Sequence, residues 1–198
     1  MDLVNKSKYK IILGSGSSRR KELLEMTGIE FLVNSIPVDE SFPNSLKSSE
    51  ISEFIVKNKS QAFNNLINKN EIIITADTLV WFENKCLGKP NDKEEAKQML
   101  KLFAGKCHDV ITSVGFLTIN NFKILTETTS VIYKNLNDAE IEYYVEKVNP
   151  VDKAGSYGIQ DWIGMIGVEH INGSYTSVLG LPVPQVTNEI IKIIHENL

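Results

Sequence analysis

Apolar residues recur along the chain at two different spacings, which predict helices and strands mixed along the sequence. Apolar side chains at helical spacing, such as Ile51 and Ile55, predict a helix over 49–67. A β-branched and aromatic run predicts a strand over 71–82, interrupted by one acidic residue, Asp77. Helices and strands that alternate in this way favour an α/β or α+β fold built on a mixed sheet.

Turn and capping residues set the bounds of the other expected elements. Gly28 and Gly105 end two helices, and an Asn-Asn pair joins two long strands as an antiparallel pair. The further strands are expected over 9–13, 30–35, 85–87, 109–120, 122–133 and 164–171, and the further helices over 19–26, 92–103, 137–149 and 183–197. No repeat, low-complexity tract or linker divides the sequence, so we expect a single domain over 1–198.

Composition limits the classes of protein to which this chain can belong and the kinds of partner that it can bind. The chain has 198 residues, 42% of them hydrophobic, and a net charge of -4, which disfavours binding to nucleic acid. The apolar runs are far shorter than a membrane span, and the N-terminus lacks the apolar core of a secretory signal, so a cytoplasmic protein with no membrane partner is expected. Cys86 and Cys107 are too few for a disulfide framework or a zinc site, so both are expected to be reduced and structural.

The segment GSGSSRRKELL follows the first expected strand and leads into a helix, where unpaired backbone N–H groups favour an anion. Ser15 and Ser17 add hydroxyl donors, and Arg19 and Arg20 add planar cations suited to phosphate oxygens. The segment is neither a dinucleotide fingerprint, which would need glycine at position 19, nor a P-loop. The alternative is that the serines only cap the helix and the arginines are solvated.

Asp77 and Lys89 are the next candidates for chemistry. A carboxylate inside an apolar strand is costly unless a metal, a cation or hydrogen bonds compensate, so Asp77 is a candidate metal ligand or general base. The alternative is an aspartate at a β-bulge, bonded to nearby N–H groups. Lys89 lies in the short segment GKP, and the alternative for it is an exposed loop lysine.

Two further features suit phosphoryl chemistry, in which carboxylates, a hard divalent ion and several cations offset charge on phosphate oxygens. Asp39 and Glu40 form a carboxylate pair on an expected loop, and Lys59 lies on the expected helix. The segment DKAGSYGIQ, residues 152–160, has the mix of glycine, polar and aromatic residues of a ligand-contacting loop, with a surface turn as the alternative.

Taken together, these segments resemble the Maf-like nucleoside triphosphate pyrophosphatases, also called septum formation proteins. The resemblance spans nearly the whole chain and rests on GSGSSRRKELL, ITADTLV, LGKP, FAGKCHDV, DKAGSYGIQ and INGSYTSVLGLP. One departure is Ser18, where the family usually has proline, which removes no catalytic group. Several ordered motifs that agree are far more specific than any one of them.

The resemblance implies an α/β fold of the Maf/ITPase-like type, an elongated mixed β-sheet flanked by helices with a central cleft. It implies an enzyme that hydrolyses a nucleoside triphosphate to the monophosphate and pyrophosphate. The DKAGSYGIQ form is similar to the subgroup that acts on dTTP and UTP, not the one that acts on methylated GTP. Members are often homodimers. The alternative function is a non-catalytic nucleotide-binding regulator of septum formation; a phosphatase of another fold is disfavoured because no second acidic residue follows Asp77 closely.

The resemblance also assigns roles to individual residues. Asp77 matches the proton acceptor, and a divalent cation, Mg²⁺ or Mn²⁺, is the implied cofactor. Gln160 offers a donor and an acceptor side by side, which match the imide edge of uracil or thymine. The expected set is Asp77, Lys59 and Lys89 for catalysis, Ser15, Ser17, Arg19, Arg20, Thr78 and Gln160 for substrate binding, and Asp77 with Glu40 for the metal.

Overall fold

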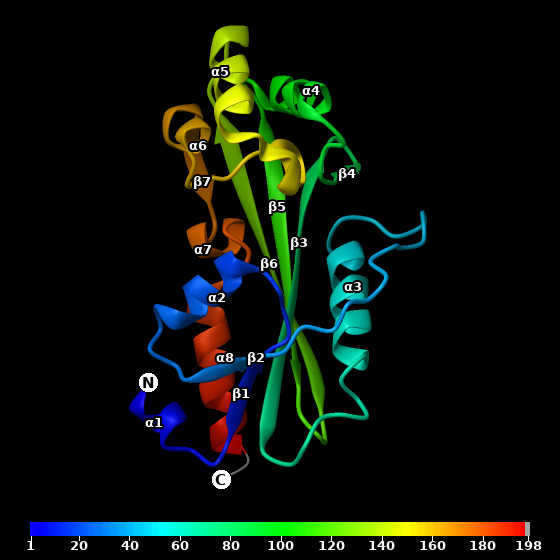
Figure 1. The fold of residues 1–198 in the computed structure, drawn as a ribbon, viewed down its shortest axis with the longest axis vertical. Helices are drawn as coiled ribbons and strands as arrows, with labels where there is room; N and C mark the ends of the chain where they lie inside the picture. The colour runs from blue at the N-terminus through cyan, green and yellow to red at the C-terminus, as the bar shows by residue number, and fades with distance from the viewer. Residues whose placement is uncertain (197–198) are drawn as a thin grey trace.

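The computed structural model describes residues 1–196, which form one long sheet with helices on both faces (Figure 1). The sheet has seven strands in the order β2-β1-β3-β5-β6-β7, with β4 beside β3. The strands are β1 (Lys10–Leu13), β2 (Phe31–Val33), β3 (Glu71–Phe82), β4 (Lys85–Leu87), β5 (Cys107–Leu117), β6 (Phe122–Tyr133) and β7 (Val168–Asn172). Because β1 pairs in parallel with β2 and β3 while the other pairs are antiparallel, the expected mixed sheet is confirmed.

Helices cover the sheet at three places (Figure 1). The helix α3 lies on one face, α2 and α8 lie together on the other, and α4 and α5 cover the upper end. The α-helices are α1 (Asp2–Asn5), α2 (Ser18–Glu25), α3 (Ser49–Gln61), α4 (Lys93–Phe103), α5 (Asp138–Val148), α6 (Trp162–Gly167), α7 (Tyr175–Val178) and α8 (Val183–Glu196), and short 3-10 turns are η1 (Pro150–Asp152) and η2 (Ala154–Ser156). Within the described residues, no helix has the length and apolar character that crossing a bilayer requires.

Two expected elements differ from the structure by more than three residues at one end. The helix expected over 49–67 ends at Gln61, and the chain continues in tight turns that bury Phe63. The strand expected over 164–171 is wrong in its first half, because α6 occupies Trp162–Gly167 and β7 begins only at Val168. Ile163, Gly164 and Gly167 are buried at the spacing of one helical face, a pattern that two glycines hide in the sequence. The last residue expected in the closing helix, Asn197, lies outside the described residues.

The middle of β3 has a free edge, and this edge opens the cleft. Strand β1 pairs with β3 only over 71–74, and β4 pairs with it only over 80–82. Between these contacts, residues 75–79 have no strand on that side within residues 1–196. At Gly14 the chain turns out of the sheet, where an added Cβ would lie 3.0 Å from Thr75 and 3.1 Å from the ring of Phe63.

A row of polar residues extends across neighbouring strands of the sheet at the level of this free edge. Asp77 pairs with Ser113 of β5, and the next residue, Thr78, pairs with Thr112. Because side chains alternate along a strand, Asp77 faces α3 and Thr78 faces the opposite side of the sheet. Apolar clusters lie above and below this polar row on each face. The sheet therefore supplies polar groups to the cleft from both faces.

Candidate active site

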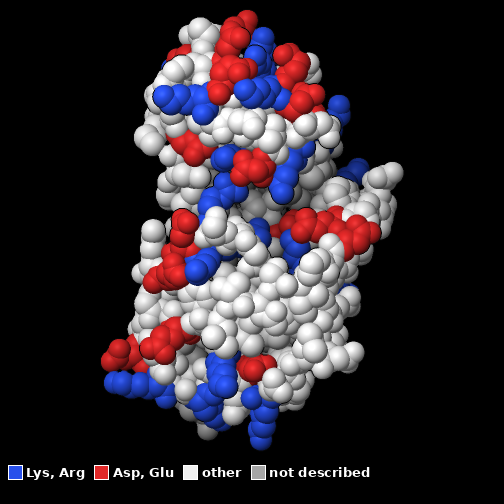
Figure 2. Space-filling model, viewed as in Figure 1, with Lys and Arg blue, Asp and Glu red and all other residues white. Residues whose placement is uncertain are grey.

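A cleft of about 890 Å³ lies at the free edge of β3. In Figure 2 the middle of the molecule is hollowed, and Lys, Arg, Asp and Glu atoms gather around the hollow. The cleft is lined by every residue that the sequence assigned to a site, namely Ser15, Ser17, Arg19, Arg20, Glu40, Lys59, Asp77, Thr78, Lys89 and Gln160. Tertiary structure thus brings together residues from both ends of the chain.

Lys59 joins the two carboxylates on the α3 side of the cleft. Its Nζ lies 2.9 Å from Asp77 Oδ1 and 2.8 Å from Glu40 Oε1, and it also donates to the carbonyl oxygen of Ala76 over 3.3 Å. The pairing of β3 with β5 runs without a bulge through Asp77, and the charge partner of this carboxylate is the Lys59 ammonium. The β-bulge alternative for Asp77 is therefore wrong.

The pKa of the Glu40 carboxyl group depends on the cations around it. Partial burial raises the pKa of Glu40, but the hydrogen bond and charge of Lys59, together with the charges of Lys89 and Arg20, lower the pKa below its ordinary value. Glu40 is accordingly an anion at neutral pH. Asp39 does not line the cleft, and its two carboxylate oxygens accept from the backbone N–H and hydroxyl of Ser41.

Arg20 lies on the other face of the sheet and is held by three hydrogen bonds. Nε donates to the carbonyl oxygen of Gly180 over 2.9 Å, Nη1 donates to Ser15 Oγ over 3.2 Å, and Nη2 donates to Thr78 Oγ1 over 3.2 Å. Burial lowers the pKa of Arg20, and the charge of Asp77 opposes that effect. The second N–H of each terminal nitrogen has no partner within residues 1–196, which leaves a fixed fork available to an anion.

The helix α2 begins at the edge of the cleft, as the sequence predicts. Ser17 is the N-cap residue, and its Oγ accepts from the backbone N–H of Arg20. The capping alternative for this serine is thus confirmed, whereas Arg20 is held inside the cleft and is not a solvated side chain. Ser18 occupies the first helical position, where proline is also well tolerated, so the departure from the family pattern leaves the turn intact.

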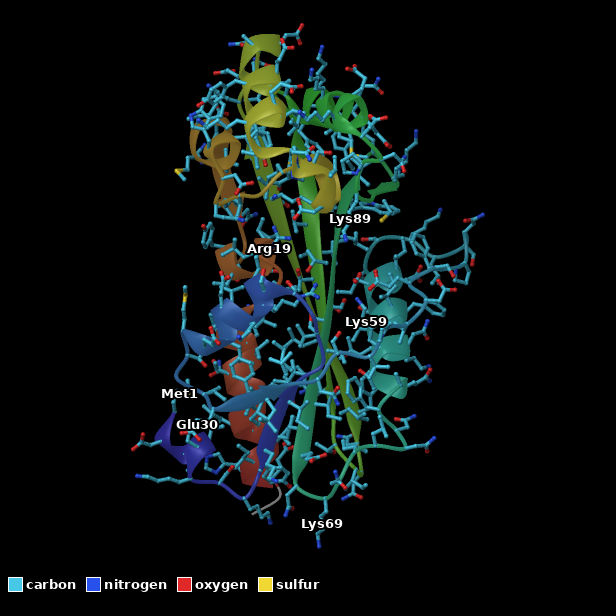
Figure 3. All side chains as sticks on the ribbon, viewed as in Figure 1. Met1, Arg19, Glu30, Lys59, Lys69 and Lys89 are labelled. Atoms are coloured by element: carbon cyan, nitrogen blue, oxygen red, sulfur yellow. The ribbon has the colours of Figure 1, made fainter. Side chains whose placement is uncertain are left out.

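Several polar side chains on the cleft wall have no hydrogen-bond partner within the described part of the chain, and Arg19, Lys89 and Gln160 are among them. Figure 3 shows Arg19 and Lys89 with Lys59 around the middle of the molecule, on α2, on the loop after β4, and on α3. Lys89 is exposed, as its alternative requires, but it also lines the cleft. These groups are available to a ligand.

The residue types in the cleft suit a hard cation and a polyphosphate. Among residues 1–196, no three His, Cys, Asp or Glu side chains cluster as a metal site would require. Asp77 and Glu40 nonetheless place carboxylate oxygens within hydrogen-bonding distance of one nitrogen, Lys59 Nζ. Mg²⁺ is commonly held by one or two carboxylates together with substrate phosphates and water, so this pair fits such an ion.

The sequence missed part of the network that holds Arg20 and Thr78 in place, namely Thr112, Ser177 and Gly180. Thr78 Oγ1 lies 2.9 Å from Thr112 Oγ1, and Thr112 in turn donates to the carbonyl oxygen of Ser177 over 2.8 Å. Gly180, the acceptor for Arg20, has a φ of 107°. The signal for Ser177 and Gly180 was the motif INGSYTSVLGLP, which the sequence alone could not connect to Arg20.

Comparison with known proteins places these motifs in context. A family model described as Maf-like protein matches residues 10–193. The chain is 46% identical over 192 residues to the dTTP/UTP pyrophosphatase of Phocaeicola vulgatus, covering 96% of this chain and 100% of that protein. It is 46% identical over 189 residues to the dTTP/UTP pyrophosphatase of Bacteroides fragilis, covering 95% and 98%. Among solved structures, the Staphylococcus aureus Ham1 protein is similar at 13% identity and a TM-score of 0.47, covering 64% and 72% of the two chains.

Proposed function

The chain belongs to the Maf-like protein family, and we propose that it hydrolyses dTTP and UTP to the nucleoside monophosphate and pyrophosphate. Relatives with that activity in their names are similar over nearly the whole chain. The observation that carries the proposal is the contact of Lys59 with both Asp77 and Glu40 in a cleft that also presents Arg20. This arrangement combines a candidate base with cations for a polyphosphate.

In this proposal the triphosphate lies between the two faces of the cleft. Arg20 presents its two free N–H groups in a fixed orientation, because its other donors are bonded to Gly180, Ser15 and Thr78. Lys59 and Lys89 add positive charge from the opposite side. Fixed cations of this kind position the substrate and stabilise the charge that develops on phosphate oxygens in the transition state.

Asp77 acts as the proton acceptor in the same proposal. Its Oδ1 is bonded to Lys59, while Oδ2 has no partner among the described residues. A water molecule held by Oδ2 attacks the α-phosphorus, its proton passes to Asp77, and the bond from the α-phosphorus to the bridging oxygen breaks. Pyrophosphate leaves with that oxygen, and no protein nucleophile takes part.

A divalent cation, Mg²⁺ or Mn²⁺, would be held by Asp77 and Glu40 together with phosphate oxygens. When bound, such an ion neutralises phosphate charge and lowers the pKa of a coordinated water. Glu40 contributes an oxygen that is ionised at neutral pH, because the surrounding cations lower its pKa against the effect of burial.

Gln160 reads the base in this proposal. Its carboxamide lines the cleft without a partner among the described residues, and it offers the donor and acceptor that match a uracil or thymine imide. Arg19 can only donate hydrogen bonds, so near a base carbonyl it favours uracil or thymine over cytosine. Selection of pyrimidine imides therefore needs both residues.

The test is incubation of the purified protein with a panel of nucleoside triphosphates and Mg²⁺, followed by analysis of the products. The proposal expects pyrophosphate and monophosphate from dTTP and UTP, at rates well above those for CTP, ATP and GTP. Binding of nucleotides without any pyrophosphate release would instead indicate a non-catalytic regulator. Release of orthophosphate would contradict attack at the α-phosphorus.

A further inference from the structure

The segment 158–161, which carries Gln160, is tied to a single oxygen atom inside the protein. That atom is the hydroxyl of Tyr144, a residue of α5 with 0% exposure. The hydroxyl donates to Asp161 Oδ2 over 2.8 Å and accepts from the backbone N–H of Gly158 over 3.3 Å. Both ends of the segment are therefore bonded to Tyr144.

Asp161 makes this contact instead of the helix-capping hydrogen bond that is usual at its position. It is the N-cap residue of α6, but its side chain accepts no capping hydrogen bond. An aspartate at this position ordinarily accepts from a backbone N–H in the first helical turn. Here the carboxylate turns instead to Tyr144, with Lys153 Nζ 3.9 Å away. The Asp161 side chain therefore anchors the segment that precedes α6 and does not cap this helix.

Gly158 couples Asp161 to Gln160. A Cβ added at Gly158 would lie 2.7 Å from Asp161 Oδ2 and 2.9 Å from Gln160 Nε2. The carboxylate and the carboxamide therefore both lie over the same glycine, and a side chain at position 158 would displace both of them. A change in the orientation of Asp161 consequently alters the space available to Gln160.

We infer that Tyr144 is a positioning residue for base selection, which holds the Gln160 carboxamide in the cleft through Asp161 and Gly158. The inference rests on the proposed role of Gln160 in reading the base. Tyr144 itself does not line the cleft, so it reaches the substrate only through this segment. Asp77 and Lys59 receive no hydrogen bond from Tyr144, so the chemical step is expected to be spared.

The hydroxyl of Tyr144 is a donor throughout the neutral range. Burial raises its pKa, and the hydrogen bond to Asp161 raises it further. Replacement by phenylalanine keeps the ring in the core but leaves the Gly158 N–H unpaired and the Asp161 carboxylate without its donor. A loss of this kind is typically enough to change binding by about tenfold.

Tyr144→Phe is the test, and Tyr133→Phe is its matched control. Both tyrosines are buried in the same apolar cluster, but the Tyr133 hydroxyl has no hydrogen-bond partner among the described residues. For Tyr144→Phe we expect KM for UTP to rise about tenfold, kcat to change less than about twofold, and the preference for UTP over CTP to fall. Tyr133→Phe is expected to keep the wild-type values. An unchanged KM and preference in Tyr144→Phe, or equal changes in both variants, would overturn the inference.

Variants of Asp161 separate positioning from a general loss of packing. Asp161→Asn keeps an acceptor for the Tyr144 hydroxyl and is expected to retain more of the base preference than Asp161→Ala, which removes it. Equal preference in these two variants would count against the inference. Dissociation constants for UTP and CTP are measured alongside turnover. A wild-type protein that binds UTP preferentially but releases no pyrophosphate would then contradict the proposed function alone, and a wild type with no base preference would contradict both.

Discussion

Gly155 donates its backbone N–H to the carbonyl oxygen of Gly88 over 3.0 Å, and this hydrogen bond joins the loop that carries Lys89 to the loop that carries Gln160. Two features restrict position 155 to glycine. Its φ is 67°, in the left-handed region, and an added Cβ would lie 2.9 Å from Val80 Cγ2. The loop that carries Lys89 and the loop that carries Gln160 therefore depend on one backbone position.

Gly155→Ala is expected to lower both stability and activity. The left-handed backbone alone costs about 1 kcal/mol for alanine, and contact with Val80 adds to that cost. Gly28→Ala is the matched control, because Gly28 has a φ of 72° but no atom within 4 Å of an added Cβ. Thermal unfolding should show a larger loss for Gly155→Ala, and only this variant should lose affinity for UTP. Equal losses in both would show that Val80 does not restrict the loop.

Asp77→Asn is expected to reduce pyrophosphate release by about 10²- to 10⁴-fold, because an amide cannot act as an anionic base. Asp39→Asn is the control, since Asp39 is bonded to Ser41 and does not line the cleft. Circular dichroism and thermal unfolding establish that both variants fold. A reduction below about tenfold in Asp77→Asn would remove this residue from the proton transfer step.

Removal of divalent metal is expected to stop pyrophosphate release, and addition of Mg²⁺ or Mn²⁺ is expected to restore it. The reason is that Asp77 and Glu40 provide oxygen ligands of the kind that these ions take. The protein is dialysed against EDTA, and activity is then titrated with each ion. Full activity in an excess of chelator would refute the metal requirement.

Gln160→Glu is expected to lower kcat/KM for UTP by about tenfold or more, because a base carbonyl would then face a carboxylate. Gln98→Glu adds the same charge at an exposed position on α4 and serves as the control. Both variants are compared on UTP, CTP and GTP. The same selectivity in Gln160→Glu as in the wild type would place base recognition elsewhere in the cleft.

His108 is expected to make the protein sensitive to acid. Burial lowers the pKa of His108 from 6.5 to about 3, so the unfolded chain binds a proton below pH 6.5 that the folded chain does not bind. The free energy of unfolding therefore decreases as the pH is lowered from 6.5 to about 3. For this group the loss between pH 7 and pH 5 is about 2 kcal/mol.

Urea unfolding of the wild type and of His108→Gln at pH 7 and pH 5 measures this contribution. The variant should lose less stability between the two pH values than the wild type. His170→Gln, at an exposed position, should keep the wild-type difference. If His108→Gln also keeps it, proton binding to the buried imidazole does not explain the acid sensitivity.

Local sequence determined the elements whose signals lie within a few residues. The strand over 122–133 was predicted with the bounds of β6, and Asn137 and Glu140 form the reciprocal capping contacts of α5. Such patterns suffice because backbone conformation, capping and side-chain alternation act between near neighbours. Where the local signal was ambiguous, as in the glycine-containing run of α6, the prediction was wrong. Gly167 there packs closely against the ring of Tyr133, a contact between distant residues that the local pattern does not encode.

The sequence also identified ten of the residues that line the cleft, mainly through ordered motifs, but it could not show how they meet. Lys59 contacts Asp77 across 18 residues of chain, and Arg20 contacts Gly180 across 160. Such contacts follow from the strand order and from the free edge of β3. Both of these features depend on many pairings between distant segments of the chain. Tyr144 carried no chemical signal in the sequence, because a buried tyrosine reads as core. Only the tertiary structure brought its hydroxyl to Gly158 and Asp161, since hydrogen bonds between distant segments depend on packing that no local pattern encodes.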